Sequence, residues 1–147
     1  MIGSQLAMEI EYKHAEIYAQ FSILNDPKQC TRGGADCRNC PIEDLTPCRR
    51  DFDRICANLL NLMLHHFQLE ESAMRQLDKA NHGLKEIFEP HKEEHANLME
   101  QLSRTISEDV LPADGRRALQ CLIRHWLDTH VIKHDKPLIA AVGNQSL

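Results

Sequence analysis

Apolar side chains recur every three or four residues along four segments of the chain, which is the spacing of one face of an α-helix. In the first segment, about residues 5–24, the inward positions are Ala7, Ile10, His14, Ile17, Phe21 and Leu24. Asn25, Asp26 and Pro27 follow directly, and the residue before a proline is driven out of the α conformation. The pattern therefore predicts a first helix that ends near residue 24.

Three further periodic segments predict helices over about 49–78, 88–107 and 113–141. The inward positions of the second are Phe52, Cys56, Leu59, Met63, His66, Glu70, Ala73 and Leu77. The connections 79–87 and 108–112 are short enough to make neighbouring helices antiparallel, and almost no segment alternates with a period of two. We therefore predict an all-α fold, an up-down-up-down four-helix bundle that forms a single domain over residues 1–147.

One connection is long: residues 25–48, between the first two helices, form an expanded cysteine-rich loop. It contains four of the six cysteines, Cys30, Cys37, Cys40 and Cys48, and a CxxC pair followed by proline. Four thiolates can bind a structural zinc ion or an iron–sulfur cluster, and a CxxC pair can act as a redox switch. The absence of any joint role is the remaining interpretation.

The overall composition removes several classes of function. The 147 residues include 17 basic and 22 acidic side chains, a formal net charge of −5 without a basic block. Such a chain is a poor nucleic-acid binder. No stretch of 18 apolar residues predicts a membrane span, and the N-terminus lacks the apolar core of a signal peptide, so the sequence predicts a cytoplasmic protein.

Histidines and one glutamate occupy positions where the helical pattern requires apolar side chains. These are His14, His66, Glu70, His91, His95 and His130. One buried histidine is ordinary in a protein core. Five on four helices, together with a carboxylate that is costly to bury alone, indicate that these side chains share a binding partner. His66 and Glu70, like His91 and His95, are four residues apart and lie on one face of a helix.

Imidazole together with carboxylate suits iron, zinc, manganese or copper. Five or more protein ligands exceed what one tetrahedral zinc ion takes. The pattern thus favours a dinuclear site, in which Glu70 and an aspartate bridge two ions.

Three segments of the chain resemble the signatures of the hemerythrin family. They are HFQLEE at residues 66–71, HKEEH at 91–95, and WLDTHV at 126–131 followed by Asp135, and His14 is placed like the family's first-helix ligand. The resemblance covers most of residues 8–140. It implies two oxo- or hydroxo-bridged iron ions held by His14, His66, Glu70, His91, His95, His130 and Asp135.

Asp135 presents a geometric difficulty as a ligand. It follows His130 by five residues, about 140° around an ideal helix, so His134 is better aligned and is the rival ligand. The resemblance favours Asp135, and Pro137, which removes one helical hydrogen bond, offers a reason for a local distortion that re-aims it. The other histidines, His65, His82 and His125, are expected not to be ligands.

The resemblance implies a non-enzymatic protein that binds O₂ reversibly, and the nitrogen-rich ligand set favours the same function over substrate oxidation. Trp126, Leu127 and Val131 are similar to the apolar wall of the family's O₂ pocket, and plain core packing is the alternative interpretation. The N-terminal arm usual in the family is nearly absent, and the cysteine-rich loop is an addition. Both departures favour an oxygen or redox sensory input domain with an output domain or signalling partner. The alternatives are a free-standing oxygen carrier or store, a di-iron oxidase, or an enzyme acting on peroxide or NO.

Overall fold

The computed structural model describes residues 2–24, 37–80, 83–107 and 110–144, and these residues form helices without any strand. The elements in chain order are α1 (Ile2–Leu24), the 3₁₀ turn η2 (Cys37–Asn39), α2 (Ile42–Ala80), α3 (Lys85–Ser107), α4 (Pro112–His125), the π-helical segment η3 (Trp126–Asp135) and α5 (Lys136–Gly143). The predicted all-α helical bundle is confirmed.

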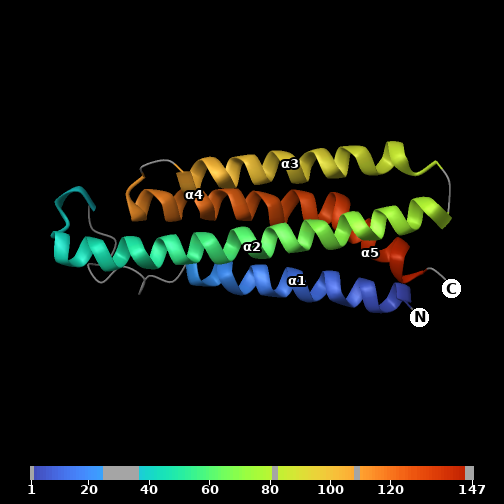
Figure 1. Cartoon of the computed structure of the whole chain (residues 1–147), viewed down its shortest axis with the longest axis horizontal. Helices are drawn as coiled ribbons and strands as arrows, with labels where there is room; N and C mark the ends of the chain where they lie inside the picture. Colours follow the sequence, from blue (N-terminus) through green and yellow to red (C-terminus); the bar gives the residue numbers. More distant parts are fainter. Residues whose placement is uncertain (1, 25–36, 81–82, 108–109, 145–147) are drawn as a thin grey trace.

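The helices form an elongated antiparallel bundle (Figure 1). α1, α2 and α3 run alongside a fourth rod made of α4, η3 and α5, whose junctions at His125, Trp126, Asp135 and Lys136 all have helical dihedral angles. The two ends of the described chain lie at the same end of the bundle, as an even number of antiparallel rods requires (Figure 1). None of the helices in the described ranges is long and apolar enough to cross a membrane.

Several helix ends differ from the prediction. α2 begins at Ile42 rather than near residue 49, so Cys48 lies within this helix and not in a loop. Pro41 precedes the helix, and Glu43 and Asp44 in its first turn interact favourably with the positive end of the helix dipole. α1 and α3 also start about three residues earlier than predicted, at Ile2 and Lys85. Cys30 lies outside the described residues.

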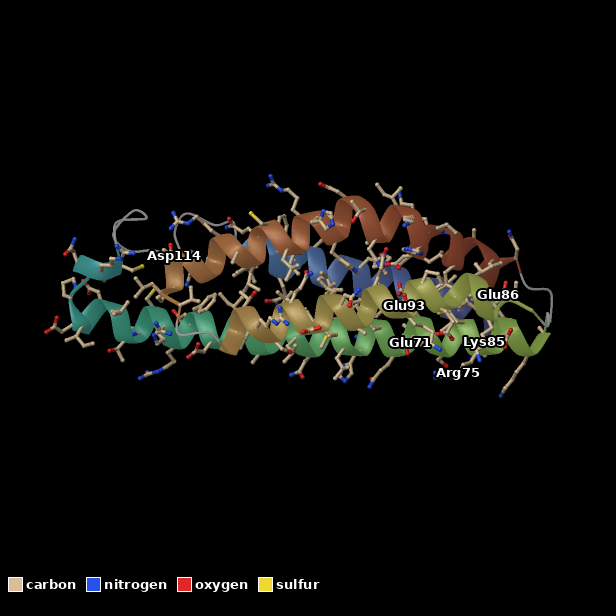
Figure 2. All side chains as sticks on the ribbon, turned by 90° about the horizontal axis from the view of Figure 1, so that it is seen from above. Glu71, Arg75, Lys85, Glu86, Glu93 and Asp114 are labelled. Carbon is tan, nitrogen blue, oxygen red and sulfur yellow. The ribbon has the colours of Figure 1, made fainter. Side chains whose placement is uncertain are left out.

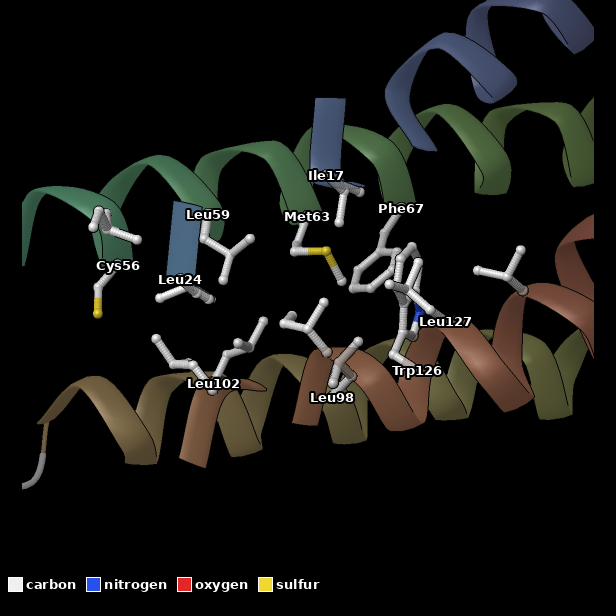
Figure 3. Packing of buried hydrophobic residues seen from close by; sticks show 14 of the residues in the cluster. Ile17, Leu24, Cys56, Leu59, Met63, Phe67, Leu98, Leu102, Trp126 and Leu127 are labelled. Carbon is white, nitrogen blue, oxygen red and sulfur yellow. The ribbon is translucent and has the colours of Figure 1, made fainter. Parts of the chain in front are cut away.

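The apolar core is divided into two clusters by a polar layer. One cluster includes Ile17, Met63 and Trp126, and the other includes Ile10, Ala73 and Leu138. Figure 3 shows the first cluster, in which side chains from α1, α2, α3, α4 and η3 pack together along the bundle axis. Since Ile10 and Ile17 flank His14 on α1, the polar layer crosses the bundle between the clusters and receives its rigidity from packing on both sides.

Candidate metal centre

Seven polar side chains from four elements meet in the layer between the two apolar clusters. They are His14 on α1, His66 and Glu70 on α2, His91 and His95 on α3, and His130 and Asp135 on η3. All are buried except His14, whose side chain is 12% exposed. These are the seven residues that the sequence singled out, and the fold brings all of them together.

One half of the layer contains three imidazoles, those of His91, His95 and His130. The Oε2 atom of Glu70 is 2.9 Å from Nε2 of His95 and 3.2 Å from Nε2 of His91. The Oδ1 atom of Asp135 is 2.9 Å from Nε2 of both His91 and His130. This three-histidine half thus has five ligand-type atoms, all within 4.8 Å of one another.

The other half contains the two imidazoles of His14 and His66, whose Nε2 atoms are 3.1 Å apart. It uses the remaining oxygen of each carboxylate: Oε1 of Glu70 is 2.8 Å from Nε2 of His66, and Oδ2 of Asp135 is 3.0 Å from Nε2 of His14. Glu70 and Asp135 therefore each turn one oxygen to the three-histidine half and one to this two-histidine half.

The π-helical segment η3 places Asp135, and not His134, against Glu70 and the other histidines of the polar layer, while His134 forms a separate group with Glu94 and His130. The backbone N–H of Lys136 donates to the carbonyl of Val131, five residues back, which is the π-type hydrogen bond. This winding aligns Asp135 with His130 and leaves His134 turned toward Glu94, with 3.2 Å between Nε2 and Oε1. The distortion extends over residues 126–135, ahead of Pro137, and is not confined to one strained turn beside the proline as the sequence suggested.

Carboxylates also lie behind two of the imidazoles. Glu71 Oε1 is 3.1 Å from Nδ1 of His95, and Glu94 Oε2 is 2.8 Å from Nδ1 of His130. Glu71 lies on α2, next to α3, in Figure 2. Each neutral ring carries one proton, so a ring that donates through Nδ1 presents only a lone pair at Nε2.

The protonation states of these rings indicate that the donor set fits a metal ion. With Nδ1 protonated, the lone pairs of His95 and His130 face carboxylate oxygens at 2.9 Å, an acceptor–acceptor contact that needs a cation or an extra proton between the atoms. Nε2 of His95, Nε2 of His130 and both oxygens of Glu70 are buried without a hydrogen-bond partner among the described residues. Two ligands at right angles around one ion, each about 2.1 Å from it, lie about 3.0 Å apart, which matches these spacings.

The charges of the layer shift the pKa values of its members in opposite directions. Burial alone would lower the pKa of His14, but its hydrogen bond to Asp135 and the nearby carboxylate of Glu70 outweigh burial and raise it to about 9. The pKa of His91 rises to about 9 for the same reasons. Burial opposes ionisation of Glu70 and Asp135, yet the surrounding imidazoles hold the pKa of each carboxylate well below its usual value.

Aromatic and aliphatic side chains close the layer on the side of the first cluster. The Trp126 ring stacks on His130, with centroids 5.9 Å apart, and meets His66 edge-on at 5.5 Å. Leu127 and Val131 are buried in the same cluster, which fits both an apolar pocket wall and plain core packing. Phe67, which the sequence analysis did not assign to this wall, stacks on His95 with centroids 4.0 Å apart.

A groove of about 310 Å³ leads from the surface to this wall. Trp126 and His130 contribute to its lining, together with the polar side chains of Glu94, Asn97, Gln101, Thr129 and Lys133. The groove lies between α3 and the rod that contains η3. It brings solvent next to Glu94, on the outer side of the His130 ring.

The cysteines do not form a second metal cluster within the described part of the chain. Cys37, Cys40 and Cys48 are each half-buried, and none belongs to a group of three or more potential ligand atoms there. The helical pattern of the sequence also predicts core positions for the two remaining cysteines, Cys56 and Cys121. Cys56 is buried as predicted, and burial raises the pKa of its thiol to about 11, whereas Cys121 is exposed, so that prediction was wrong.

Comparison with known families is consistent with this geometry. A family model described as the hemerythrin HHE cation binding domain matches residues 9–142. The matched range includes every residue of the polar layer. No curated protein and no solved structure matches the chain.

Proposed function

The chain belongs to the hemerythrin family, and from this we propose that it is a non-haem di-iron protein that binds O₂ reversibly. In this proposal the iron ligands are His14, His66, Glu70, His91, His95, His130 and Asp135. Two bridged iron ions would supply the electrons that bind O₂ and take them back on release. The protein is then a binding or sensing protein and not an enzyme.

The single observation that carries the proposal is the bridging arrangement of the two carboxylates. Glu70 has Oε1 at 2.8 Å from His66 and Oε2 at 2.9 Å from His95. Asp135 likewise has Oδ2 at 3.0 Å from His14 and Oδ1 at 2.9 Å from His91. One ion does not need two carboxylates that each divide their oxygens between two sets of imidazoles, whereas two adjacent ions do.

The charge of the ligand set favours O₂ binding over oxidation of a substrate. Five neutral imidazoles and two carboxylates contribute −2, so a centre of two divalent ions keeps a net positive charge. Carboxylate-rich centres neutralise more of this charge and stabilise higher oxidation states. The nitrogen-rich set therefore supports the reduced state from which O₂ is bound.

The two halves of the site contribute differently. The three-histidine half offers five protein atoms and the two-histidine half offers four, which leaves more room for an external ligand beside His14 and His66. Trp126 packs edge-on against both of these rings, and the buried Leu127 and Val131 extend the apolar wall. This wall keeps water and protons from the ligand position, which favours release of O₂ unchanged.

The test compares the number of iron ions bound per chain in the wild-type protein and in two variants, Glu70→Gln and its control Glu43→Gln. The metal-free protein is incubated with Fe²⁺ without oxygen, and bound iron is counted per chain. We expect two ions for the wild-type protein and for Glu43→Gln, a charge-neutralising change at an exposed position of the same helix. Glu70→Gln should retain fewer than two. A wild-type stoichiometry of one or none would refute the dinuclear proposal.

We further propose that the O₂-binding domain is a sensory input domain, with a free-standing carrier as the alternative. The support is the set of half-buried cysteines Cys37, Cys40 and Cys48, which lie around the start of α2, far along the bundle from the metal-ligating layer. A sensor must change conformation with ligand state, and a carrier need not. Hydrogen exchange of the deoxy and oxygenated forms should differ outside the ligand layer for a sensor, and identical exchange there would favour a carrier.

A further inference from the structure

The five imidazoles of the layer differ in what lies behind them. In the three-histidine half, His95 and His130 direct Nδ1 to the carboxylates of Glu71 and Glu94, at 3.1 and 2.8 Å. Both carboxylates reach the surface, with 30% and 40% of their side chains exposed. Two of the three rings in this half are therefore anchored from outside by a negative charge.

The two-histidine half lacks such support on His66. Nδ1 of His66 is buried and has no hydrogen-bond partner among the described residues. The His66 side chain is also fully buried, so bulk solvent does not reach Nδ1. His14, the other ring of this half, comes from α1 and remains partly exposed.

An outer carboxylate affects metal binding in two ways. It fixes the ring as the tautomer whose Nε2 lone pair points at the metal, and it makes that nitrogen a stronger electron donor. Loss of such a partner typically weakens metal binding by about 10- to 100-fold. The effect adds to the difference between three imidazoles and two.

Glu94 is itself held in place by the distorted segment η3. Its Oε1 atom is 3.2 Å from Nε2 of His134 and 3.8 Å from Nζ of Lys133, while Oε2 is directed at His130. The same winding that turns Asp135 inward thus turns His134 to the opposite side of Glu94. This arrangement gives His134 a position behind the ligand layer and not within it.

We propose that the two halves of the centre differ in metal affinity, so that the three-histidine half binds its ion first and releases it last, with Glu71 and Glu94 as the positioning residues that create the difference. The inference rests on the proposed dinuclear site. It predicts a stable half-loaded protein when metal is scarce. In that state the O₂-binding half is the empty one.

The experiment is a titration of the metal-free full chain with Co²⁺ in the absence of oxygen. Visible absorption follows the number of bound ions, and paramagnetically shifted proton signals follow which imidazoles are ligands. We expect two separate binding steps, with the ring protons of three histidines shifted after one equivalent and five after two. Equal steps, or two shifted histidines after one equivalent, would overturn the inference.

Variants assign the difference to the outer carboxylates. Glu94→Gln should weaken the first step by about 10- to 100-fold and leave the second in place, and Glu71→Gln should act in the same direction through His95. Glu93→Gln removes the same charge from an exposed neighbouring position on α3 and should change neither step. Because Glu71 and Glu94 lie on different helices, one variant remains informative if the other does not fold.

The outcomes separate this inference from the function on which it rests. A wild-type chain that binds no cobalt, or only one ion at saturation, contradicts the dinuclear centre itself. If Glu94→Gln still binds two cobalt ions but the affinities of both steps fall equally, the dinuclear centre is retained. The proposed role of the outer carboxylates is then overturned.

Discussion

His130 and Asp135 are five residues apart in the chain, yet Nε2 of one lies 2.9 Å from Oδ1 of the other. An ideal α-helix would turn their side chains about 140° apart. The π-helical winding of Trp126–Asp135 removes this offset, and it is a conformation found mainly at functional sites. Segment η3 therefore allows both His130 and Asp135 to contribute to the polar layer.

Replacing Asp135 should disrupt the centre, whereas replacing its neighbour should not. Asp135→Asn keeps the size of the side chain but leaves one oxygen to serve two halves, so we expect fewer than two irons per chain and an altered absorption spectrum. His134→Ala should retain two irons at saturating Fe²⁺, because His134 contacts Glu94 and not the shared carboxylates. Intact iron content in Asp135→Asn combined with its loss in His134→Ala would reverse this assignment.

Leu127 should protect the oxygenated form. Leu127→Ala opens a cavity in the wall beside the histidine layer and admits water, so we expect autoxidation roughly tenfold faster than in the wild-type protein. Leu102→Ala is the matched control, since Leu102 is buried in the same cluster but lies away from Trp126, beside which Leu127 packs (Figure 3). Both variants should lose about 2–5 kcal/mol of unfolding free energy. An unchanged autoxidation rate in Leu127→Ala would remove this residue from the pocket.

Six of the seven candidate ligands were predictable because they break the apolar pattern at helical spacing, whereas Asp135 came from the family resemblance alone. His66 and Glu70, or His91 and His95, stand where the core needs an apolar side chain, and the only physical reason for several such exceptions is a common partner. The helix count followed from the same periodicity. Register on a helix face is a local property, and a local pattern suffices to find it.

Other features depend on contacts that a single sequence does not reveal. Residues 126–135 have a pattern as compatible with an α-helix as with a π-helix, so the wider winding is visible only in the structure. Glu71 and Glu94 are partly exposed acidic residues on helices rich in them, so only their distances to His95 and His130 distinguish them. The early start of α2 was missed because its first two turns are polar and contain Pro47.

The metal-free protein should be most stable in mildly acidic solution. Folding raises the pKa of His14 and His91 from 6.5 to about 9, so their contribution to stability is complete below pH 6.5 and is lost as the pH rises through 9. Folding lowers the pKa of Glu70 and Asp135, so their contribution is present above about pH 4.5 and is lost in acid. Thermal melting of the metal-free chain should therefore peak between about pH 4.5 and 6.5.

Metal loading supplies the control for this pH dependence. Bound imidazoles are neutral, so the iron-loaded protein should show little loss of melting temperature between pH 6.5 and 9, and loading near pH 7.5 should release protons. A metal-free protein whose melting temperature is flat from pH 6.5 to 9 would contradict the coupling between the imidazoles and the two carboxylates.

The cysteines should separate by reactivity. Cys121 is exposed and should react rapidly with iodoacetamide in the native protein, whereas the buried Cys56, with its pKa raised to about 11, should react only after unfolding. Mass spectrometry of the labelled chain locates each modification. Rapid labelling of Cys56 under native conditions would show that the core around α2 opens more readily than its packing implies.

Reversible oxygenation tests the central claim most directly. The chain loaded with two Fe²⁺ ions should be colourless without oxygen, gain visible charge-transfer bands on exposure to O₂, and lose them again when O₂ is removed under argon, over repeated cycles. Bands that persist under argon after the first exposure, or a chain that never develops them, would contradict reversible O₂ binding by this site.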